Sequence, residues 1–224
     1  MHTSTVHLND LSGPVCTEAA VVVDVMRAFT VAPWCFARGA TAVYLAADVE
    51  AAVNGRVDWP EALLLKDGAS DPRFDLPNAP GAVRGADLLA RTVVQVTGNG
   101  TRGAHAVADV GLVLCAAFVT AHATVRALRA AEVETVTFVV TEGDEDSAFA
   151  DYLTAILSGE NVDAAPYLRR AELSAAADEL RRRGPDPRHP GVHPDDVELC
   201  LTLDEFDFAL RTESAGEYLR LAVC

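Results

Sequence analysis

The sequence predicts an α/β fold with a mostly parallel sheet and helices on both faces, arranged as α/β/α layers. Apolar, β-branched runs alternate along the chain with segments of helical period. This alternation is typical of parallel sheets, whose strands are buried on both faces. Half of the 224 residues are hydrophobic, which is enough for a substantial core. We predict one α/β unit over residues 1–224 and leave a two-lobed arrangement open, because no linker marks a border.

In the first half of the chain, valine-rich residues 19–25 predict a buried strand, and residues 28–38 predict a helix that ends at Gly39. The loop over residues 67–81 is rich in Gly, Pro and Asp, and structureless loops of that length are usually functional or disordered. The other elements expected before residue 97 are strands 42–45, 63–65 and 93–96 and a helix over 48–54.

In the second half, a glycine-containing turn over residues 98–103 leads into further alternating elements. These are helix 104–108, strand 112–117, helix 120–130, strand 135–140, an acidic loop over 141–147 and helix 148–158. The last third differs, with one long helix, a loop rich in Pro and His, and a final strand. Their expected ranges are 166–183, 184–194 and 219–223.

The net charge is −15, from 33 acidic against 18 basic residues. So acidic a chain repels nucleic acids and anionic membranes, and we expect neither as a partner. The five cysteines include no C-x-x-C pair and are interpreted as reduced thiols. The first residues resemble no signal peptide and no apolar run is long enough to cross a bilayer, so we expect a cytoplasmic protein.

Asp24 ends the first strong strand, shortly before Arg27. In open α/β sheets ligands bind beyond the carboxyl ends of the strands, so both residues are candidates for an active site. The alternative for Asp24 is a structural role as the cap of the next helix.

The turn after strand 93–96 is a second candidate. Gly98 and Gly100 allow a sharp turn, and Asn99, Thr101 and Arg102 lie where a helix start would expose free N–H groups. We predict that this turn binds a phosphate or another oxyanion. A dinucleotide site is disfavoured because the strand that follows carries no acid for the ribose.

Carboxylates and an amide in the 67–81 loop suggest a Mg²⁺ site, since Mg²⁺ takes one or two carboxylates plus waters. The candidates are Asp67, Asp75 and Asn78, together with Asp24, and the alternative is a solvated surface loop. The acids at 144–146 are interpreted as solvated charges at a helix start, whereas Asp151 is kept as a further metal ligand. A zinc site at His189 and His193 is disfavoured because prolines interrupt the segment.

Four segments, in this order, resemble the 2-phosphosulfolactate phosphatase family. They are 22–28 (VVDVMRA), 74–80 (FDLPNAP), 99–102 (NGTR) and the helix that contains Asp151. The resemblance implies a Mg²⁺-dependent acid phosphatase acting on a small sulfonated or carboxylated phosphoester. The residues that it carries over are Asp24, Arg27, Asp75, Asn78, Asn99, Thr101, Arg102 and Asp151.

The chain departs from the family pattern at two positions. Gly68 stands where the family pattern G-E-R has arginine, and Ala150 stands where the pattern E-D has glutamate. Our first hypothesis is a Mg²⁺-dependent phosphomonoester hydrolase whose partner is a small anionic phosphoester, with homo-oligomerisation left open. The alternative is a non-catalytic or altered relative that binds a small anionic metabolite. Direct attack by water and attack by an aspartate both stay open.

Overall fold

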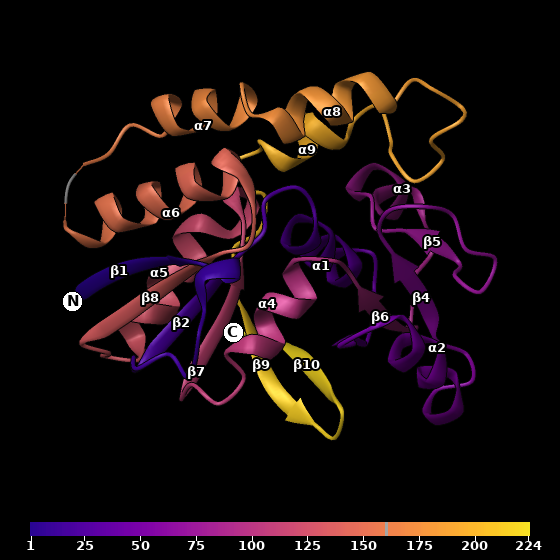
Figure 1. Cartoon of the computed structure of the whole chain (residues 1–224), viewed down its shortest axis with the longest axis horizontal. Coiled ribbons are helices and arrows are strands. Elements are labelled where there is room, and N and C mark those ends of the chain that lie inside the picture. Colours follow the sequence, from indigo (N-terminus) through magenta and orange to yellow (C-terminus); the bar gives the residue numbers. More distant parts are fainter. Residues whose placement is uncertain (160) are drawn as a thin grey trace.

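The computed structural model describes residues 1–159 and 161–224. The described residues form a ten-stranded sheet in the order β1-β8-β2-β7-β9-β10-β3-β6-β4-β5 (Figure 1). The strands are β1 (His2–His7), β2 (Ala19–Val23), β3 (Ala42–Leu45), β4 (Leu63–Lys66), β5 (Leu76–Pro77), β6 (Thr92–Val96), β7 (Leu112–Ala116), β8 (Thr135–Val140), β9 (Leu210–Ala215) and β10 (Tyr218–Val223). The α/β class predicted from the sequence is confirmed.

The helices are distributed between the strands and along the last third of the chain. They are α1 (Ala28–Ala37), α2 (Val49–Asp58), α3 (Pro80–Gly85), α4 (Gly100–Ala106), α5 (Ala121–Ala130), α6 (Gly143–Leu157), α7 (Ala165–Glu172), α8 (Ala175–Arg183) and α9 (Asp196–Cys200). The described residues also include two short 3₁₀ helices, Leu8–Asp10 and Phe118–Thr120. Among the described residues, none of the helices has the length and apolar character that a membrane span needs.

The sheet consists of two parallel halves joined by an antiparallel hairpin. Strands β1, β8, β2 and β7 are mutually parallel, and so are β3, β6, β4 and β5. The β9–β10 hairpin pairs antiparallel with β7 on one side and with β3 on the other. The two halves therefore run in opposite senses across the sheet.

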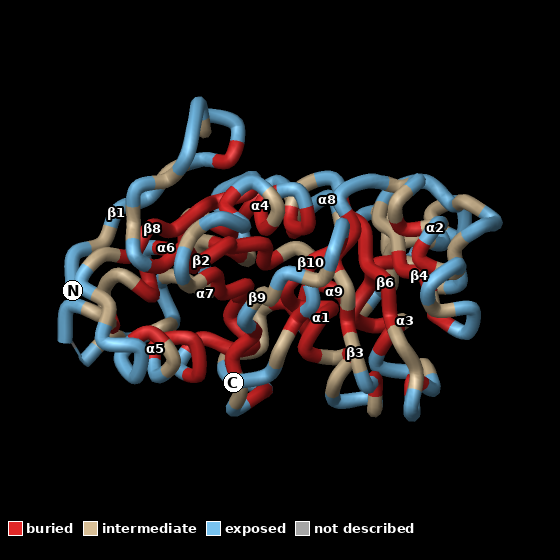
Figure 2. Tube along the Cα trace, turned by 90° about the horizontal axis from the view of Figure 1, so that it is seen from below, coloured by how far each residue is buried: buried red, intermediate tan, exposed pale blue. Residues whose placement is uncertain are grey.

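The core is centred on β2. All five of its residues are buried, so both faces of this strand are covered, as the valine-rich sequence predicts for a parallel strand. Helices α4 and α6 both contact β2. Figure 2 shows buried residues running through the strands of both halves, with exposed residues at the loops.

Several predicted boundaries need correction. Helix α6 begins at Gly143, so the predicted acidic loop over 141–147 is largely the first turns of this helix. The single helix expected over 166–183 is two helices, α7 and α8, because the Ser174 hydroxyl accepts a hydrogen bond from Ala177 N and starts a new helix. Helix α4 begins at Gly100, before the predicted start at 104.

Three strands, β1, β5 and β9, and two helices, α3 and α9, were not predicted. Strand β1 pairs with β8 at one edge of the sheet, and β9 completes the hairpin with β10. The loop predicted over 67–81 contains the short strand β5 and runs into α3, whose first residue is Pro80. Proline suits a first helical position because its missing N–H would have no intrahelical partner there.

Candidate active site

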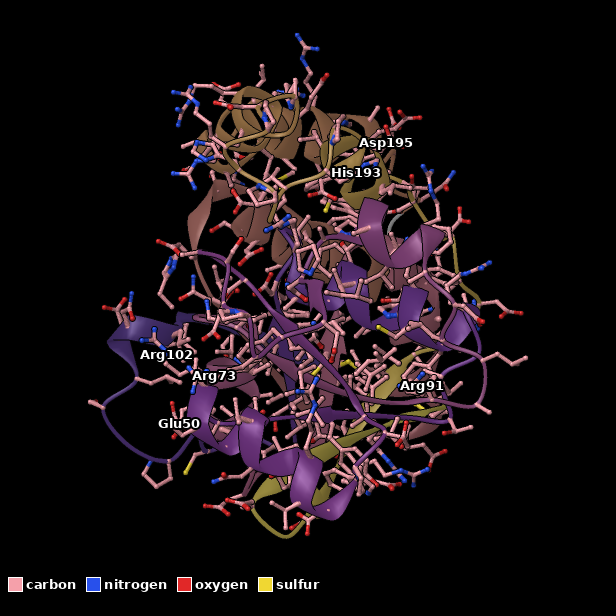
Figure 3. The ribbon with its side chains drawn as sticks, turned by 90° about the vertical axis from the view of Figure 1, so that its right-hand side faces the viewer. Glu50, Arg73, Arg91, Arg102, His193 and Asp195 are labelled. Atoms are coloured by element: carbon pink, nitrogen blue, oxygen red, sulfur yellow. The ribbon has the colours of Figure 1, made fainter. Side chains whose placement is uncertain are left out.

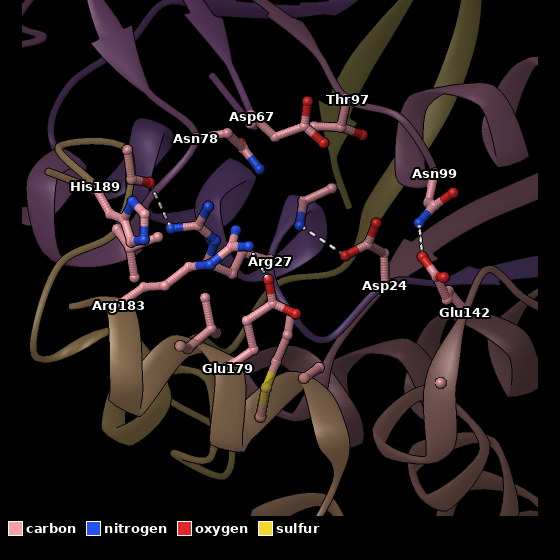
Figure 4. Close-up of a pocket in the computed structure, with 18 of the residues that line it drawn as sticks. Asp24, Arg27, Asp67, Asn78, Thr97, Asn99, Glu142, Glu179, Arg183 and His189 are labelled. Atoms are coloured by element: carbon pink, nitrogen blue, oxygen red, sulfur yellow. Dashed lines mark hydrogen bonds and ion pairs between the residues drawn. The ribbon is translucent and has the colours of Figure 1, made fainter. Parts of the chain in front are cut away.

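A cavity of about 1090 Å³ lies where the two halves of the sheet meet. Asp24 and Thr141, which follow β2 and β8, line it from one half. Asp67 and Thr97, which follow β4 and β6, line it from the other. Helix α8 and residues 187–192 line it from the last third of the chain (Figure 4). The cavity thus lies beyond strand ends, where open α/β sheets bind their ligands.

Asp24 is buried in this cavity, with only 5% of its surface exposed. Its Oδ1 accepts a hydrogen bond from Ala28 N at 2.8 Å, at the start of α1. Burial raises the pKa of Asp24 to about 7; the Ala28 hydrogen bond lowers it, and the charges of Asp67 and Glu145 raise it further. The Asp24 carboxyl group therefore accepts a hydrogen bond at the start of α1, as the capping alternative predicts, and it also lines the cavity. A carboxyl that titrates near neutrality is suited to binding a cation or moving a proton.

Asp146 is a site residue that the sequence interpretation missed. It lies in α6 and is buried, with Oδ1 accepting from Val25 N at 2.7 Å and Oδ2 accepting from Thr141 Oγ1 at 2.9 Å and from Glu142 N at 3.0 Å. Burial and the charge of Asp24 raise the pKa of Asp146 well above its ordinary value. Asp146 therefore holds the backbone directly after Asp24.

Glu145 precedes Asp146 and also lines the cavity, with 4% exposure. Burial raises the pKa of its carboxyl group. Its Oε2 has no hydrogen-bond partner among the described residues. The interpretation of residues 144–146 as solvated charges is therefore wrong for Glu145 and Asp146. The signal that could have found them is the one used for Asp24, namely acids directly after a buried strand.

The predicted oxyanion turn is largely satisfied by the protein itself. Gly98 N donates to Asp67 Oδ2 at 2.9 Å, and Thr101 N donates to Thr97 Oγ1 at 3.1 Å. The Thr101 hydroxyl is buried and donates to Thr97 O at 2.9 Å. These amides and this hydroxyl consequently stabilise the turn, and the turn holds Asp67 beside the cavity.

Gly100 is required by close packing against the site. A Cβ at this position would lie 2.6 Å from Asp24 Oδ2 and 2.5 Å from Ala28 Cβ, which is closer than such atoms approach. The sequence predicts that Gly100 allows a sharp turn. In the structure, the absence of a side chain at Gly100 allows α4 to pack closely against Asp24.

Two predicted amide side chains do line the cavity. Asn78 is buried, and its Oδ1 accepts from Gln95 Nε2 at 2.7 Å. Asn99 donates to a carboxylate oxygen of Glu142 at the opposite side of the cavity (Figure 4). The Gln95 bond fixes the orientation of Asn78, so that its NH₂ group is the part free to face a ligand.

Arg27 joins the site to the last third of the chain. Its Nη1 donates to Gly191 O at 2.9 Å and to Asp196 Oδ2 at 2.6 Å. The side chain of Arg27 is 8% exposed and that of Asp196 is fully buried. Arg27 lines the cavity as predicted, and it also holds the 187–192 segment over it.

Known proteins resemble this chain over most of its length. The sequence profile of 2-phosphosulpholactate phosphatase matches residues 6–214. The chain belongs to the 2-phosphosulfolactate phosphatase family. A probable 2-phosphosulfolactate phosphatase of Bacillus subtilis is 28% identical over 204 residues, which cover 88% of each chain. Proteins of the same description from Parasynechococcus marenigrum and Deinococcus radiodurans are 33% and 34% identical, over 89% and 76% of this chain and 90% and 72% of their own.

Four residues carried over from the phosphatase family pattern, Thr101 with Asp75, Arg102 and Asp151, do not line the cavity. Asp75 bonds Arg56 at 2.6 Å and Leu64 N at 2.8 Å, and it lies beside the short strand β5. Arg102 is exposed and donates to Asn9 Oδ1 at 2.8 Å (Figure 3). Asp151 is exposed and pairs with Arg170 at 2.6 Å. Of the four predicted metal ligands, Asp24 and Asp67 therefore line the cavity, whereas Asp75 and Asp151 lie outside it.

A glutamate directly followed by an aspartate, the order of the family pattern E-D, also occurs at Glu145 and Asp146. Both side chains lie in the cavity, whereas Ala150 is fully buried in the core and Asp151 faces solvent. By their place at the cavity, Glu145 and Asp146 suit this motif better than Ala150 and Asp151 do. Gly68 has a φ of +72°, a backbone conformation that disfavours an arginine at this position.

The donor set suits a hard divalent cation held partly by waters. Among the described residues no three His, Cys, Asp or Glu side chains form a metal-binding group, so the protein would supply one or two carboxylates. This is the mode in which Mg²⁺ is usually bound. Glu145 Oε2, buried and without a partner among the described residues, is an oxygen that a cation or its water would satisfy.

The two histidines considered for zinc are separated by the structure. His189 lines the cavity, whereas His193 Nδ1 accepts a hydrogen bond from Asp195 N at 3.1 Å.

Proposed function

We propose that this protein is a Mg²⁺-dependent phosphatase that hydrolyses a small phosphoester bearing a carboxylate, a sulfonate or both, such as 2-phosphosulfolactate. The observation that carries the proposal is the composition of the cavity. Buried carboxylates from Asp24, Glu145 and Asp146 lie at one end, and arginines reach it from the other. A divalent cation would balance the negative charge of the carboxylates, and an anionic ester would balance the positive charge of the arginines.

In this proposal Asp24 and Asp67 would hold Mg²⁺, and Glu145 Oε2 would accept a hydrogen bond from a water of the cation. The bound cation supplies polarisation of a phosphoryl oxygen and a lowered pKa for its water. Asp146 takes no part in bond breaking and keeps the Val25 amide, and with it Asp24, in position. The NH₂ group of Asn78 donates to a phosphoryl oxygen. This bond stabilises the negative charge that spreads over the phosphoryl oxygens in the transition state.

Arg27 contributes positive charge toward the ester while it keeps the 187–192 segment over the cavity. Covering the cavity excludes water, and charge interactions inside it strengthen as a result. The backbone of the 98–102 turn has a smaller part than the sequence suggested, because two of its amides have protein partners.

A matched series of three esters tests the proposal. Isopropyl phosphate carries only the phosphate, 2-phospholactate adds a carboxylate, and 2-phosphosulfolactate adds a carboxylate and a sulfonate. We expect phosphate release from the charged members in the presence of Mg²⁺ and its loss when EDTA removes the cation. A Mg²⁺-dependent rise of Tm that is absent in Asp24→Asn is expected alongside, because a ligand of the folded state stabilises it by mass action.

The alternative of a non-catalytic relative is an outcome of the same experiment. Tight binding of the esters without phosphate release, with or without Mg²⁺, would favour it over hydrolysis. One of its two motives, the missing glutamate at Ala150, has weakened, since Glu145 supplies a glutamate in the cavity.

A further inference from the structure

Arg183, the last residue of α8, is the side chain on which this inference rests. It lines the cavity from the last third of the chain, on the same side as Arg27 (Figure 4). Its Nη2 pairs with Glu179 Oε1 at 2.6 Å, and Glu179 lines the cavity too. Its Nε is buried and has no hydrogen-bond partner among the described residues. Arg183 therefore keeps an unused donor at the cavity.

The unused donor matters because of guanidinium geometry. The Nε and Nη2 atoms form one edge of the group, which matches two oxygens of a carboxylate or sulfonate. Arg73 shows the complete arrangement, with Nε 3.1 Å from Asp71 Oδ1 and Nη2 2.8 Å from Asp71 Oδ2. In Arg183 only Nη2 is paired, with Glu179, and Nε has no acceptor among the described residues. A buried N–H without a partner destabilises the free protein, so a ligand that satisfies both nitrogens gains affinity.

The contact with Glu179 is also easily replaced. The Glu179 side chain is 46% exposed and lies one helical turn before Arg183, so the pair is a surface ion pair of small net stability. Glu179 can turn to solvent when a ligand anion arrives, without any movement of the helix.

Two other arginines, Arg73 and Arg188, have both Nε and Nη2 already bound to an aspartate. Arg73, the residue that could have replaced the arginine missing at Gly68, is bound to Asp71 and Glu50 and does not line the cavity (Figure 3). Arg188 lines the cavity, but its Nε and Nη2 are both bound to Asp186 and its side chain is 84% exposed.

We propose that Arg183 is a specificity-determining residue that binds the carboxylate or sulfonate which the substrate carries besides its phosphate, displacing Glu179. This inference rests on the proposed function in taking the cavity to bind a phosphoester. It also supplies an arginine for the second anion of the substrate, for which Gly68 provides none.

The test uses the Arg183→Met variant and the three esters described above. Methionine keeps an unbranched apolar stem but no donors. We expect kcat/KM for 2-phospholactate and 2-phosphosulfolactate to fall about 10- to 100-fold, the usual effect of a lost charged hydrogen bond, and kcat/KM for isopropyl phosphate to stay within about twofold. The fall should lie mainly in KM. Arg182→Met, on the same helix but exposed and outside the cavity, is the matched control.

A second variant, Glu179→Gln, removes the competing carboxylate. We expect it to lower KM for the two carboxylated esters relative to isopropyl phosphate. An equal loss for all three esters in Arg183→Met, or no loss for any, would overturn the proposal. If the wild type releases no phosphate from any ester, the proposed function fails. Calorimetric binding of 2-phospholactate to wild type and Arg183→Met then decides this inference separately, with equal affinities counting against it.

Discussion

The two ends of the cavity are built in different ways. The carboxylate end consists of buried side chains, Asp24 and Asp146, that accept hydrogen bonds from backbone amides at the start of α1 and shortly after β2. The other end carries Arg183 and Arg188, which are half or mostly exposed and pair with acids on their own segments. Buried, hydrogen-bonded groups hold one geometry, whereas exposed ion pairs rearrange at little cost. The comparison indicates a fixed end for the phosphoryl chemistry and an adjustable end for the rest of the substrate.

Asp196→Ala tests how the two ends are joined and should have the largest effect. It leaves the buried Arg27 charge without its carboxylate, and it removes the acceptor for Gly81 N and His193 N. We expect the free energy of unfolding to fall by about 3–5 kcal/mol in urea denaturation. The control is Asp195→Ala, whose exposed pair with Arg84 is worth at most about 1 kcal/mol. Equal losses in both variants would show that Arg27 does not fasten the two ends together.

Asp24→Asn tests the fixed end. The amide keeps an oxygen to accept from Ala28 N but removes the negative charge. We expect phosphate release to fall about 10²- to 10³-fold, with no loss in the free energy of unfolding, because a buried carboxylate with a raised pKa is costly to keep charged. Asp109→Asn, an exposed acid away from the cavity, is the control. Retained phosphate release in Asp24→Asn would remove the basis for assigning chemistry to this end.

Gly100→Ala sharpens the claim that the fixed end is tightly packed. The added methyl group would meet Asp24 Oδ2 and Ala28 Cβ, so α4 or Asp24 has to move. We expect a loss of about 1–3 kcal/mol in the free energy of unfolding, together with reduced phosphate release. Gly85→Ala is the comparison, because a Cβ there would meet no atom within 4 Å. Similar stability of the two variants would mean that the packing around Asp24 is looser than described.

Arg102→Ala should have the smallest effect. Its side chain is exposed, bonds Asn9 and lies outside the cavity, so we expect phosphate release to change less than about twofold and stability by less than about 0.5 kcal/mol. The family resemblance makes the opposite prediction, a direct role in binding phosphate. A loss above tenfold in kcat/KM for isopropyl phosphate would support the resemblance and place Arg102 with the fixed end.

The fold class, the family and the place of Asp24 at a strand end could all be predicted from the sequence. Hydrophobic period is a local property, so β2, α1, β6 and β8 were found within a few residues of their bounds. The strand-end rule located Asp24 because it needs only a buried strand followed by an acid. The order of four short motifs predicted a family that the sequence profile matches over residues 6–214.

Which acids and arginines meet, in contrast, depends on how distant segments pack. Asp146 bonds the Val25 amide across 121 positions of sequence, and Arg27 reaches Asp196 across 169. Charge runs look alike in sequence whether they face solvent or a site, so the sequence alone did not show that Glu145 and Asp146 line the cavity and that Asp151 faces solvent. Long-range packing also made the last third of the chain one wall of the cavity and placed Arg183 there. Such contacts depend on how distant segments pack, and no local sequence pattern records them.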